Sequence, residues 1–402
     1  MPDTQTNTAT PPRTFIVLVA SMMSITALSI DAILPALGMI GPDLKISNPN
    51  EAQFIVSFIF AGLAIGQLFN GPLSDAFGRK KVLFSGLGFY MIGSVICLFS
   101  KSVEIMLLGR FIQGFGAAGS QICAISVVRD KFRGRTMARV MSLVMMIFIM
   151  VPTIAPSIGQ GILYLGTWHS IFIFYLLYAG GVMLWAFFQL EETLVPENTV
   201  PYSLKNIGHS IKIIFTTRAT VFYTVAMGCI FSCMLSYISV CQQIYQVQFG
   251  IGDMFVVFFG IQAAAIGVAS FLNSRMVERL GMRLISSRAA GAIVLASFIF
   301  LGLHAVVEIK FWMFFLYAVM VLFNFGLIYG NLNALAMDPM GHLAGTASAI
   351  INASSMTIAI ILGTIIGQLY DGTLVPIISG FSVLGLLALL FMRLAEDKNL
   401  KA

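Results

Sequence analysis

Long apolar stretches alternate with short polar ones along the whole chain. An apolar stretch of roughly 20 residues is long enough to cross the ~30 Å hydrocarbon core of a bilayer as a helix. The residues 171–188 are apolar on all sides, whereas a strand of a membrane barrel would alternate apolar and polar residues. The pattern therefore predicts an all-α polytopic membrane protein with twelve transmembrane helices. The twelve stretches lie near residues 14–38, 53–73, 82–100, 103–127, 137–163, 168–190, 217–242, 253–275, 284–305, 310–334, 343–368 and 373–393.

Composition supports this class. Of the 402 residues, 58% are hydrophobic and 10% are charged, whereas an ordinary soluble domain has about 25% charged residues. The residues 1–13 are polar, and no small-residue cleavage site follows the first apolar stretch, so we expect no cleaved signal peptide.

Lysine and arginine predict the orientation of the helices. With both termini in the cytoplasm, cytoplasmic segments hold 19 of the 23 basic residues, and only Lys45, Lys101 and Lys310 lie outside. This asymmetry is the one that the positive-inside rule describes. The sequence pI near 9.1 therefore reflects membrane topology, and we expect no nucleic-acid partner.

The chain divides into two similar halves. The polar segment 191–216 separates two sets of six apolar stretches, which predicts a tail at 1–13, bundles at 14–190 and 217–393, and a tail at 394–402. Residues 71–80 align weakly with 274–283, each between the second and third stretch of its half. Two six-helix halves related by a pseudo-twofold axis are typical of a rocking transporter, whereas a channel or a membrane enzyme does not require the duplication.

Two ionisable side chains, Asp31 and Arg110, lie deep inside apolar stretches. A charge in hydrocarbon costs roughly 3 kcal/mol or more, so such residues usually have a function. At about 1.5 Å per helical residue, both lie roughly 12 Å from the outer ends of their helices. Burial favours the neutral carboxyl and a nearby guanidinium favours the carboxylate, so opening the site to water changes the balance. We therefore expect Asp31 to carry a proton and Arg110 to set its affinity. The alternative is a fixed buried pair that only joins two helices.

Four motifs resemble a known family. Residues 71–81 resemble the signature loop of the major facilitator superfamily, and residues 107–118 resemble its fourth-helix motif. Residues 151–160 and 28–37 are similar to the fifth-helix and first-helix motifs of twelve-span drug/proton antiporters, in particular the Bcr/CflA-like branch. The chain departs from these motifs at Ala76, Ala155 and Gln160. The resemblance implies a monomeric multi-pass protein of the bacterial inner membrane that takes part in multidrug efflux and antibiotic resistance.

The signature loop and the fifth helix also have physical interpretations. Gly71, Asp75, Gly78, Arg79 and Lys80 are predicted to form a gating loop. In one interpretation, the Asp75 carboxylate accepts hydrogen bonds only while the two halves are closed on the cytoplasmic side. In the other, the basic residues only fix the orientation of the helices in the membrane.

Pro152 and Pro156 remove two backbone donors, and Gly159 follows. We expect a hinge there, which either serves alternating access or only shapes the pocket.

The predicted substrate cavity combines flexible, aromatic and amide side chains, which can repack around different ligands. The alternative for the apolar members is packing against lipid. The candidates are Met23, Gln113, Met146, Met150, Phe231, Tyr237 and Asn331. The second half also carries several amides within its apolar stretches, among them Gln242, Gln243, Gln262, Asn324, Asn333 and Asn352.

The sequence contains no motif for nucleotide hydrolysis, metal binding or enzymatic catalysis. There is no phosphate-binding loop, and the polar segments are too short for an ATPase domain, so an ion gradient must supply the energy. Cys229 and Cys233 lie four residues apart, which would suit a metal ion, but cysteine commonly fills space in such helices. We expect no cofactor, no metal site and no enzymatic activity.

The expected function is proton-coupled export of small lipophilic or amphipathic compounds, with chloramphenicol-like drugs implied by the resemblance. The alternatives are a carrier of one physiological metabolite, such as a siderophore or an amino-acid derivative, and a membrane sensor or membrane-bound enzyme.

Overall fold

The computed structural model of the chain describes residues 12–194 and 204–396. Within these two ranges every regular element is a helix, and twelve helical segments are long and apolar enough to cross a membrane. Each of them falls on one of the twelve predicted stretches. The all-α, twelve-span prediction is therefore confirmed.

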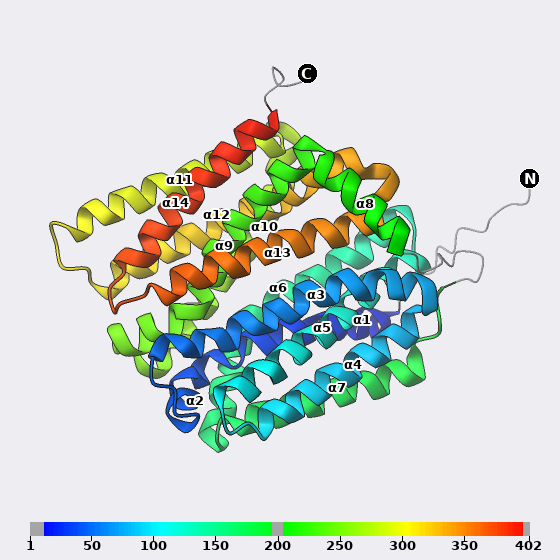
Figure 1. Cartoon of the computed structure of the whole chain (residues 1–402), viewed down its shortest axis with the longest axis horizontal. Coiled ribbons are helices and arrows are strands. Elements are labelled where there is room, and N and C mark those ends of the chain that lie inside the picture. The colour runs from blue at the N-terminus through cyan, green and yellow to red at the C-terminus, as the bar shows by residue number, and fades with distance from the viewer. Residues whose placement is uncertain (1–11, 195–203, 397–402) are drawn as a thin grey trace, which may run out of the picture.

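The helices form two bundles, which lie side by side in Figure 1. The amphipathic helix α8 (Leu204–Thr216) connects them and packs against α9 and α13. The first bundle contains α1 (Arg13–Asp31), α2 (Leu37–Asp43), α3 (Phe54–Phe77), α4 (Arg79–Leu98), α5 (Val103–Lys131), α6 (Gly134–Leu165) and α7 (His169–Gln189). The second contains α9 (Arg218–Gln242), α10 (Phe255–Leu280), α11 (Met282–His304), α12 (Phe311–Met337), α13 (Ala344–Gln368) and α14 (Val375–Glu396).

Equivalent glycines end equivalent helices in the two bundles. Gly78 separates α3 from α4 with a φ of 107°, and Gly281 separates α10 from α11 with a φ of 78°. Side-chain-bearing residues rarely adopt such angles, whereas glycine does so without a steric penalty. The two turns occupy corresponding places in the aligned segments 71–80 and 274–283, so the internal repeat has a structural counterpart.

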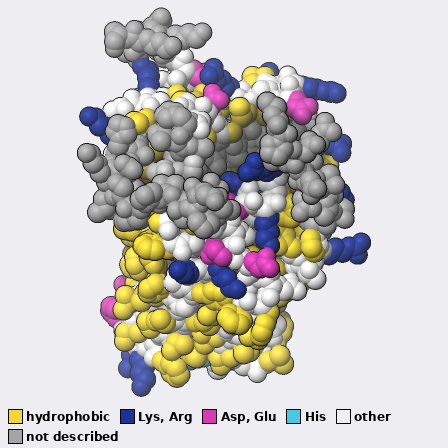
Figure 2. Space-filling view, turned by 90° about the vertical axis from the view of Figure 1, so that its right-hand side faces the viewer, with side chains coloured by type: hydrophobic (Ala, Val, Ile, Leu, Met, Phe, Trp, Pro, Cys, Tyr) yellow, Lys and Arg dark blue, Asp and Glu magenta, His cyan; other side chains and the backbone are white. Residues whose placement is uncertain are grey.

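We call the end of the molecule where α1 begins and α14 finishes the terminal end, and the opposite end the distal end (Figure 1). Figure 2 views the molecule from the right-hand side of Figure 1, and lysine and arginine side chains are spread over this face. Lys45, Lys101 and Lys310, the three basic residues predicted to lie outside, are in loops at the distal end.

The bundles meet along two helix pairs, α3 with α13 and α6 with α10. In the described parts of the chain, every side-chain hydrogen bond that joins the two bundles lies on the distal side, for example Thr364 Oγ1 to Ser57 Oγ at 3.0 Å. The ion pairs of the terminal end each join residues of a single bundle. The interface is thus fastened at its distal end.

Candidate functional site

The first membrane-spanning segment is broken directly after Asp31. Helix α1 ends there, and a single 3₁₀ turn (Leu34–Ala36) leads into α2. Pro35 explains the break, because it has no N–H to donate to the carbonyl of Asp31 and its ring collides with that carbonyl in an unbroken helix. The predicted span over 14–38 is present as the single membrane-spanning segment Arg13–Asp43, and within it Asp31 lies at a helix end.

Arg110 and Tyr175 satisfy the carbonyl groups that this break exposes. The last carbonyls of a helix have no partner within the helix. Arg110 Nη2 donates to the carbonyl of Ser29 at 2.8 Å, and the Tyr175 hydroxyl donates to the carbonyl of Leu28 at 3.1 Å. The guanidinium is also favourably placed at the negative end of the helix dipole.

Arg110 also holds α3 and its own helix. Its Nε donates to the carbonyl of Ile55 at 3.0 Å, and its Nη1 donates to Gln113 Oε1 at 2.5 Å. Gln113 in turn donates to Ser94 Oγ at 2.8 Å. The Arg110 side chain is completely buried, so it works as a buried clamp between α1, α3 and α5.

Asp31 is 5% exposed, and among the described residues its carboxyl has neither an ion pair nor a protein hydrogen-bond partner. The fixed ion pair with Arg110, one of the two sequence interpretations, is not formed, because Arg110 binds backbone carbonyls instead. A buried ionised carboxylate without a partner is costly. Asp31 is therefore free to exchange a proton or to meet a ligand.

The carboxyl of Asp31 borders a small cavity of about 50 Å³ between the two bundles. Asp31 and Pro152 come from the first bundle, and the other lining residues come from α9, α10 and α12 of the second. These are Met234, Tyr237, Ile238, Phe259, Gln262, Ala263, Ile266 and Leu322. Drug-sized ligands occupy pockets of about 300–1,000 Å³. The cavity in this conformation thus accommodates only small molecules such as water.

Two polar side chains, Tyr237 and Gln262, line this largely apolar cavity together with Asp31. The hydroxyl of Tyr237 donates to Gln262 Oε1, and Gln262 Nε2 donates to the hydroxyl of Tyr245. All three side chains are buried. Sequence reasoning named Tyr237 as a cavity residue and noted Gln262 only as one of several amides. Asp31 was identified because it is a charged residue in an apolar stretch. Gln262 is also polar and also lies in an apolar stretch, but it is uncharged, so its signal in the sequence is weaker.

The other predicted cavity residues do not line this cavity. Met23 is buried in the core of the first bundle, and Gln113 is occupied by Arg110. Asn331 exchanges hydrogen bonds with Asn273 on α10 at 2.8 and 3.1 Å. Phe231 lies at the bundle interface, with its ring centroid 5.8 Å from that of Phe60.

Met146 and Met150 lie on α6 and are each more than half exposed. Pro152 and Pro156 lie further along the same helix, which continues without interruption to Leu165.

Gly159 lies against the break in the first span. A Cβ at this position would overlap the carbonyl group of Ala32, next to Asp31. This glycine therefore permits a close approach between α6 and the end of α1. The hinge role of Pro152, Pro156 and Gly159 stays a prediction.

The charged residues of the signature loop make their contacts within the first bundle. Arg79 pairs with Asp75 at 2.5 Å and with Asp130 at 2.9 Å. Glu192, just after α7, accepts the backbone N–H groups of Arg79 and Lys80 at 2.9 and 3.1 Å, where a carboxylate also benefits from the helix dipole.

Gly71 approaches the second bundle, and a Cβ there would lie 3.9 Å from Ala349 Cβ. In the described chain, Asp75 forms ion pairs only with Arg79 and Arg129 of the first bundle. The state-dependent contact of the gating loop therefore stays a prediction.

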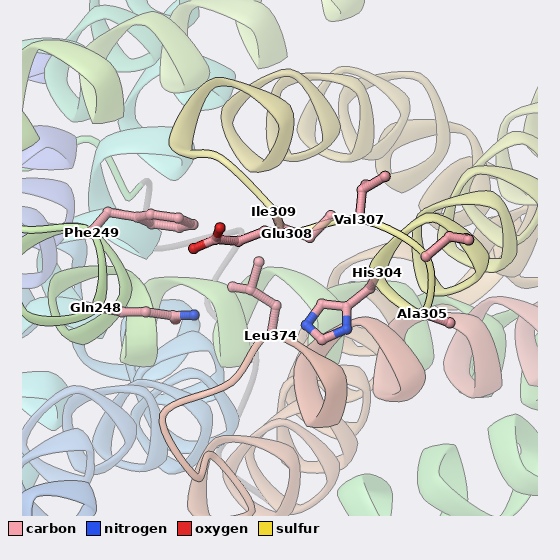
Figure 3. Close-up of a pocket in the computed structure, with 9 residues that line it drawn as sticks. Gln248, Phe249, His304, Ala305, Val307, Glu308, Ile309 and Leu374 are labelled. Atoms are coloured by element: carbon pink, nitrogen blue, oxygen red, sulfur yellow. The ribbon is translucent and has the colours of Figure 1, made fainter.

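A larger hollow of about 600 Å³ lies at the distal end of the second bundle, far from Asp31 in the fold (Figure 3). The end of α11, the loop between α11 and α12, the residue before α14 and the segment after α9 surround it. Glu308 and His304 point toward it in Figure 3, but Glu308 lies in an exposed loop and His304 is the last, half-buried residue of α11. We therefore place the functional site at Asp31.

Comparison with known proteins agrees with this architecture. The family model of the Major Facilitator Superfamily matches residues 15–364. The chain is 30% identical to the uncharacterized MFS-type transporter YdgK of Bacillus subtilis over 87% of each chain. It is 28% identical to a bicyclomycin resistance protein homolog of Haemophilus influenzae, over 96% of this chain and 97% of the relative. It is 29% identical to the multidrug resistance protein MdtL of Escherichia coli over 44% and 46% of the two chains.

Solved structures share the fold at low sequence identity. The D-xylose–proton symporter superposes with a TM-score of 0.74 at 14% identity, over 94% of this chain and 97% of that one. A peptide transporter, POT, solved in complex with sulfate, gives a TM-score of 0.75 at 12% identity, over 95% and 92%. With the twelve spans, the internal repeat and the family model in agreement, the chain belongs to the Major Facilitator Superfamily of membrane transporters and is not an enzyme.

Proposed function

We propose that this chain is a proton-coupled transporter that exports small lipophilic or amphipathic compounds by alternating access. The observation that carries the proposal is Asp31, a buried carboxyl at the interface between the two bundles to which residues 12–194 and 204–396 supply no hydrogen-bond or ion-pair partner. Burial without a partner favours the protonated carboxyl, and access to water favours the carboxylate. A rocking motion that exposes this cavity first to one side and then to the other would therefore load and release a proton.

The surroundings of Asp31 suit this role. The groups nearest to it along α1 are carbonyls held by Arg110 and Tyr175, so the helix end keeps its shape whether or not Asp31 is protonated. Arg110 donates to the carbonyl of Ser29, two residues before Asp31, and does not pair with the Asp31 carboxyl. From this position the guanidinium would adjust the affinity for the proton and leave the carboxyl free.

The lining of the cavity supports lipophilic substrates. Met234, Phe259 and Leu322 provide flexible and aromatic apolar surface, and Tyr237 and Gln262 provide a small polar patch. The names of two relatives, one a bicyclomycin resistance protein homolog and the other a multidrug resistance protein, support drug-type export. A larger cavity would have to form when substrate enters, because about 50 Å³ holds no drug-sized molecule.

Overproduction of the protein is expected to lower the intracellular accumulation of several unrelated, neutral or weakly charged lipophilic compounds. A protonophore should restore accumulation, because it removes the gradient that drives export. The measurement compares labelled compounds in cells with and without the protein, at equal expression of an inactive variant. A response restricted to one polar metabolite would instead favour the physiological-carrier function.

The proposed location is the inner membrane of a bacterium, with both termini in the cytoplasm and the protein acting as a monomer. The basic residues at the terminal end support this orientation. The distal end would then face outward, and the structure would have its outer side closed.

Cysteines introduced at Lys45 or Lys310, both exposed at the distal end, are expected to react with an impermeant thiol reagent in intact spheroplasts. A cysteine at Lys212, exposed on α8, should react only after lysis. The five native cysteines are buried, so background labelling should be low. The reverse pattern of labelling would contradict the orientation.

A further inference from the structure

A cluster of amide side chains fastens the two bundles at the distal end. Asn50, which precedes α3, donates from Nδ2 to the carbonyls of Tyr370 at 2.7 Å and Gln368 at 3.2 Å. Gln368, at the end of α13, donates in return from Nε2 to the carbonyl of Asn50 at 2.7 Å. The two bundles therefore exchange hydrogen bonds in both directions at this point.

A second pair of amides extends the cluster. Gln53 Nε2 donates to Gln243 Oε1 at 2.8 Å, and Gln243 Nε2 donates to Asn50 Oδ1 at 3.2 Å. Gln53 is 2% exposed, whereas Asn50 and Gln243 are partly buried, so the bonds made by Gln53 are the best protected from water. A Cβ at residue 367 would collide with Gln53 Oε1, so Gly367 allows α13 to approach closely. We call Asn50, Gln53, Gln243 and Gln368 the amide cluster.

A π-helical segment places one member of the cluster. Residues Gln243–Gln248 follow α9 in this wider geometry, which is frequent at functional sites. Gln248, at the end of the segment, accepts a hydrogen bond from the Tyr370 hydroxyl at 2.9 Å. Burial and the nearby carboxylate of Asp371 raise the pKa of Tyr370 to about 12, so its hydroxyl remains a donor at neutral pH. This bond lies within the second bundle, where it connects the segment that carries Gln243 with the chain that follows Gln368.

Further from the distal end, uncharged side chains also join the two bundles. Thr364 and Ser57 hydrogen-bond between α13 and α3, and Phe60 contacts Phe231 edge to face. A separate tie between α6 and the start of α10 does use a carboxylate, since Tyr164 donates to Asp253 at 2.7 Å. The amide cluster is therefore the partly buried, uncharged part of the distal closure.

We propose that the amide cluster is an uncharged latch, whose breakage limits opening of the distal side and which makes the closed-distal conformation the resting state. The inference rests on the proposed alternating access. Hydrogen bonds between neutral amides are little affected by dissolved ions, whereas exposed ion pairs are screened. The resting balance of conformations is therefore set by bonds that do not respond to ionic strength.

The test uses the full-length protein, purified and spin-labelled through cysteines at Lys45 and Lys310, one in each bundle at the distal end. Pulsed electron paramagnetic resonance gives the distance between them without substrate or a pH gradient. Gln53→Leu is similar in size and loses the bonds to Gln243 and Gln368. Each hydrogen bond has a modest net value, so we expect the population with a longer distance to rise about tenfold. Asn50→Leu should act in the same direction.

Thr373→Val is the matched control, because Thr373 lies at the same end and hydrogen-bonds only with Asp371 of its own bundle. The control should retain the wild-type distance distribution, and the wild-type distribution should not change between low and high salt. An unchanged distribution in folded Gln53→Leu and Asn50→Leu, or a strong dependence on salt in the wild type, would overturn the latch. Transport is not part of this measurement, so its outcome is independent of whether protons drive export.

Discussion

Replacement of Asp31 by asparagine is expected to abolish transport driven by a pH gradient and to leave a folded protein that still binds substrate. Asparagine has nearly the same shape and cannot carry a proton in exchange for substrate. The Asp31 carboxyl has no hydrogen bond or ion pair to lose within the described chain, so the loss of stability should be small. Proteoliposomes with an imposed pH gradient measure transport, and substrate-induced proton release is followed in detergent.

Asp253→Asn provides the control for that experiment. Asp253 is also an acidic residue between the bundles, but it lies at the distal end and accepts hydrogen bonds from Tyr164 and Gln160 at the surface. This variant should keep pH-driven transport and substrate-induced proton release. Full proton-coupled transport by Asp31→Asn would disprove the assignment of Asp31 as the proton carrier.

Replacement of Arg110 by methionine is expected to destabilise the first bundle and to abolish transport. The change removes the donors to the carbonyls of Ser29 and Ile55 and to the side chain of Gln113. Each buried polar group left without a partner costs about 1–3 kcal/mol. We therefore expect a clear fall in the melting temperature of the purified protein, together with loss of activity.

Two further arginine variants separate packing from charge. Arg110→Lys keeps the positive charge, but a single ammonium cannot reproduce the planar fork that reaches three partners. It should recover part of the stability and should show a shifted pH dependence of transport if Arg110 adjusts the proton affinity of Asp31. Arg129→Leu removes an arginine whose side chain is 48% exposed and should leave stability almost unchanged. A stable, fully active Arg110→Met variant would contradict the clamp.

The sequence was sufficient for the twelve spans because a bilayer permits few solutions. Backbone groups in lipid must be satisfied within the segment, so an apolar stretch of sufficient length is a helix. The same argument identified Asp31 and Arg110, since a charge in such a stretch is costly. Gly78 and Gly281 could also be aligned from the sequence, and their turns occupy equivalent places in the two bundles.

The break after Asp31 had a local signal that the sequence interpretation did not use. Pro35 follows four residues later, at the spacing where its ring collides with the carbonyl of Asp31. The hydrophobicity of an apolar stretch is the same whether the helix inside it is continuous or interrupted. Hydrophobicity alone therefore located the span, but it did not predict the 3₁₀ turn and the short helix α2 that follow α1 within it.

The partners of Arg110 could not be predicted, because two of them are backbone carbonyls, which every residue possesses. The cavity presents the same difficulty, since Asp31 comes from α1 of the first bundle, whereas Tyr237 and Gln262 come from α9 and α10 of the second. Which faces of these helices meet depends on how the two bundles pack.

By itself, the sequence determined the class of protein, the number of spans, the repeat and the two buried charges, because the cost of polar groups in lipid acts on each segment separately. Only the tertiary structure decided that Arg110 binds the carbonyl of Ser29 and leaves Asp31 unpaired, and that uncharged amides close the distal side. Those features depend on distances between helices, and packing of the whole chain sets these distances.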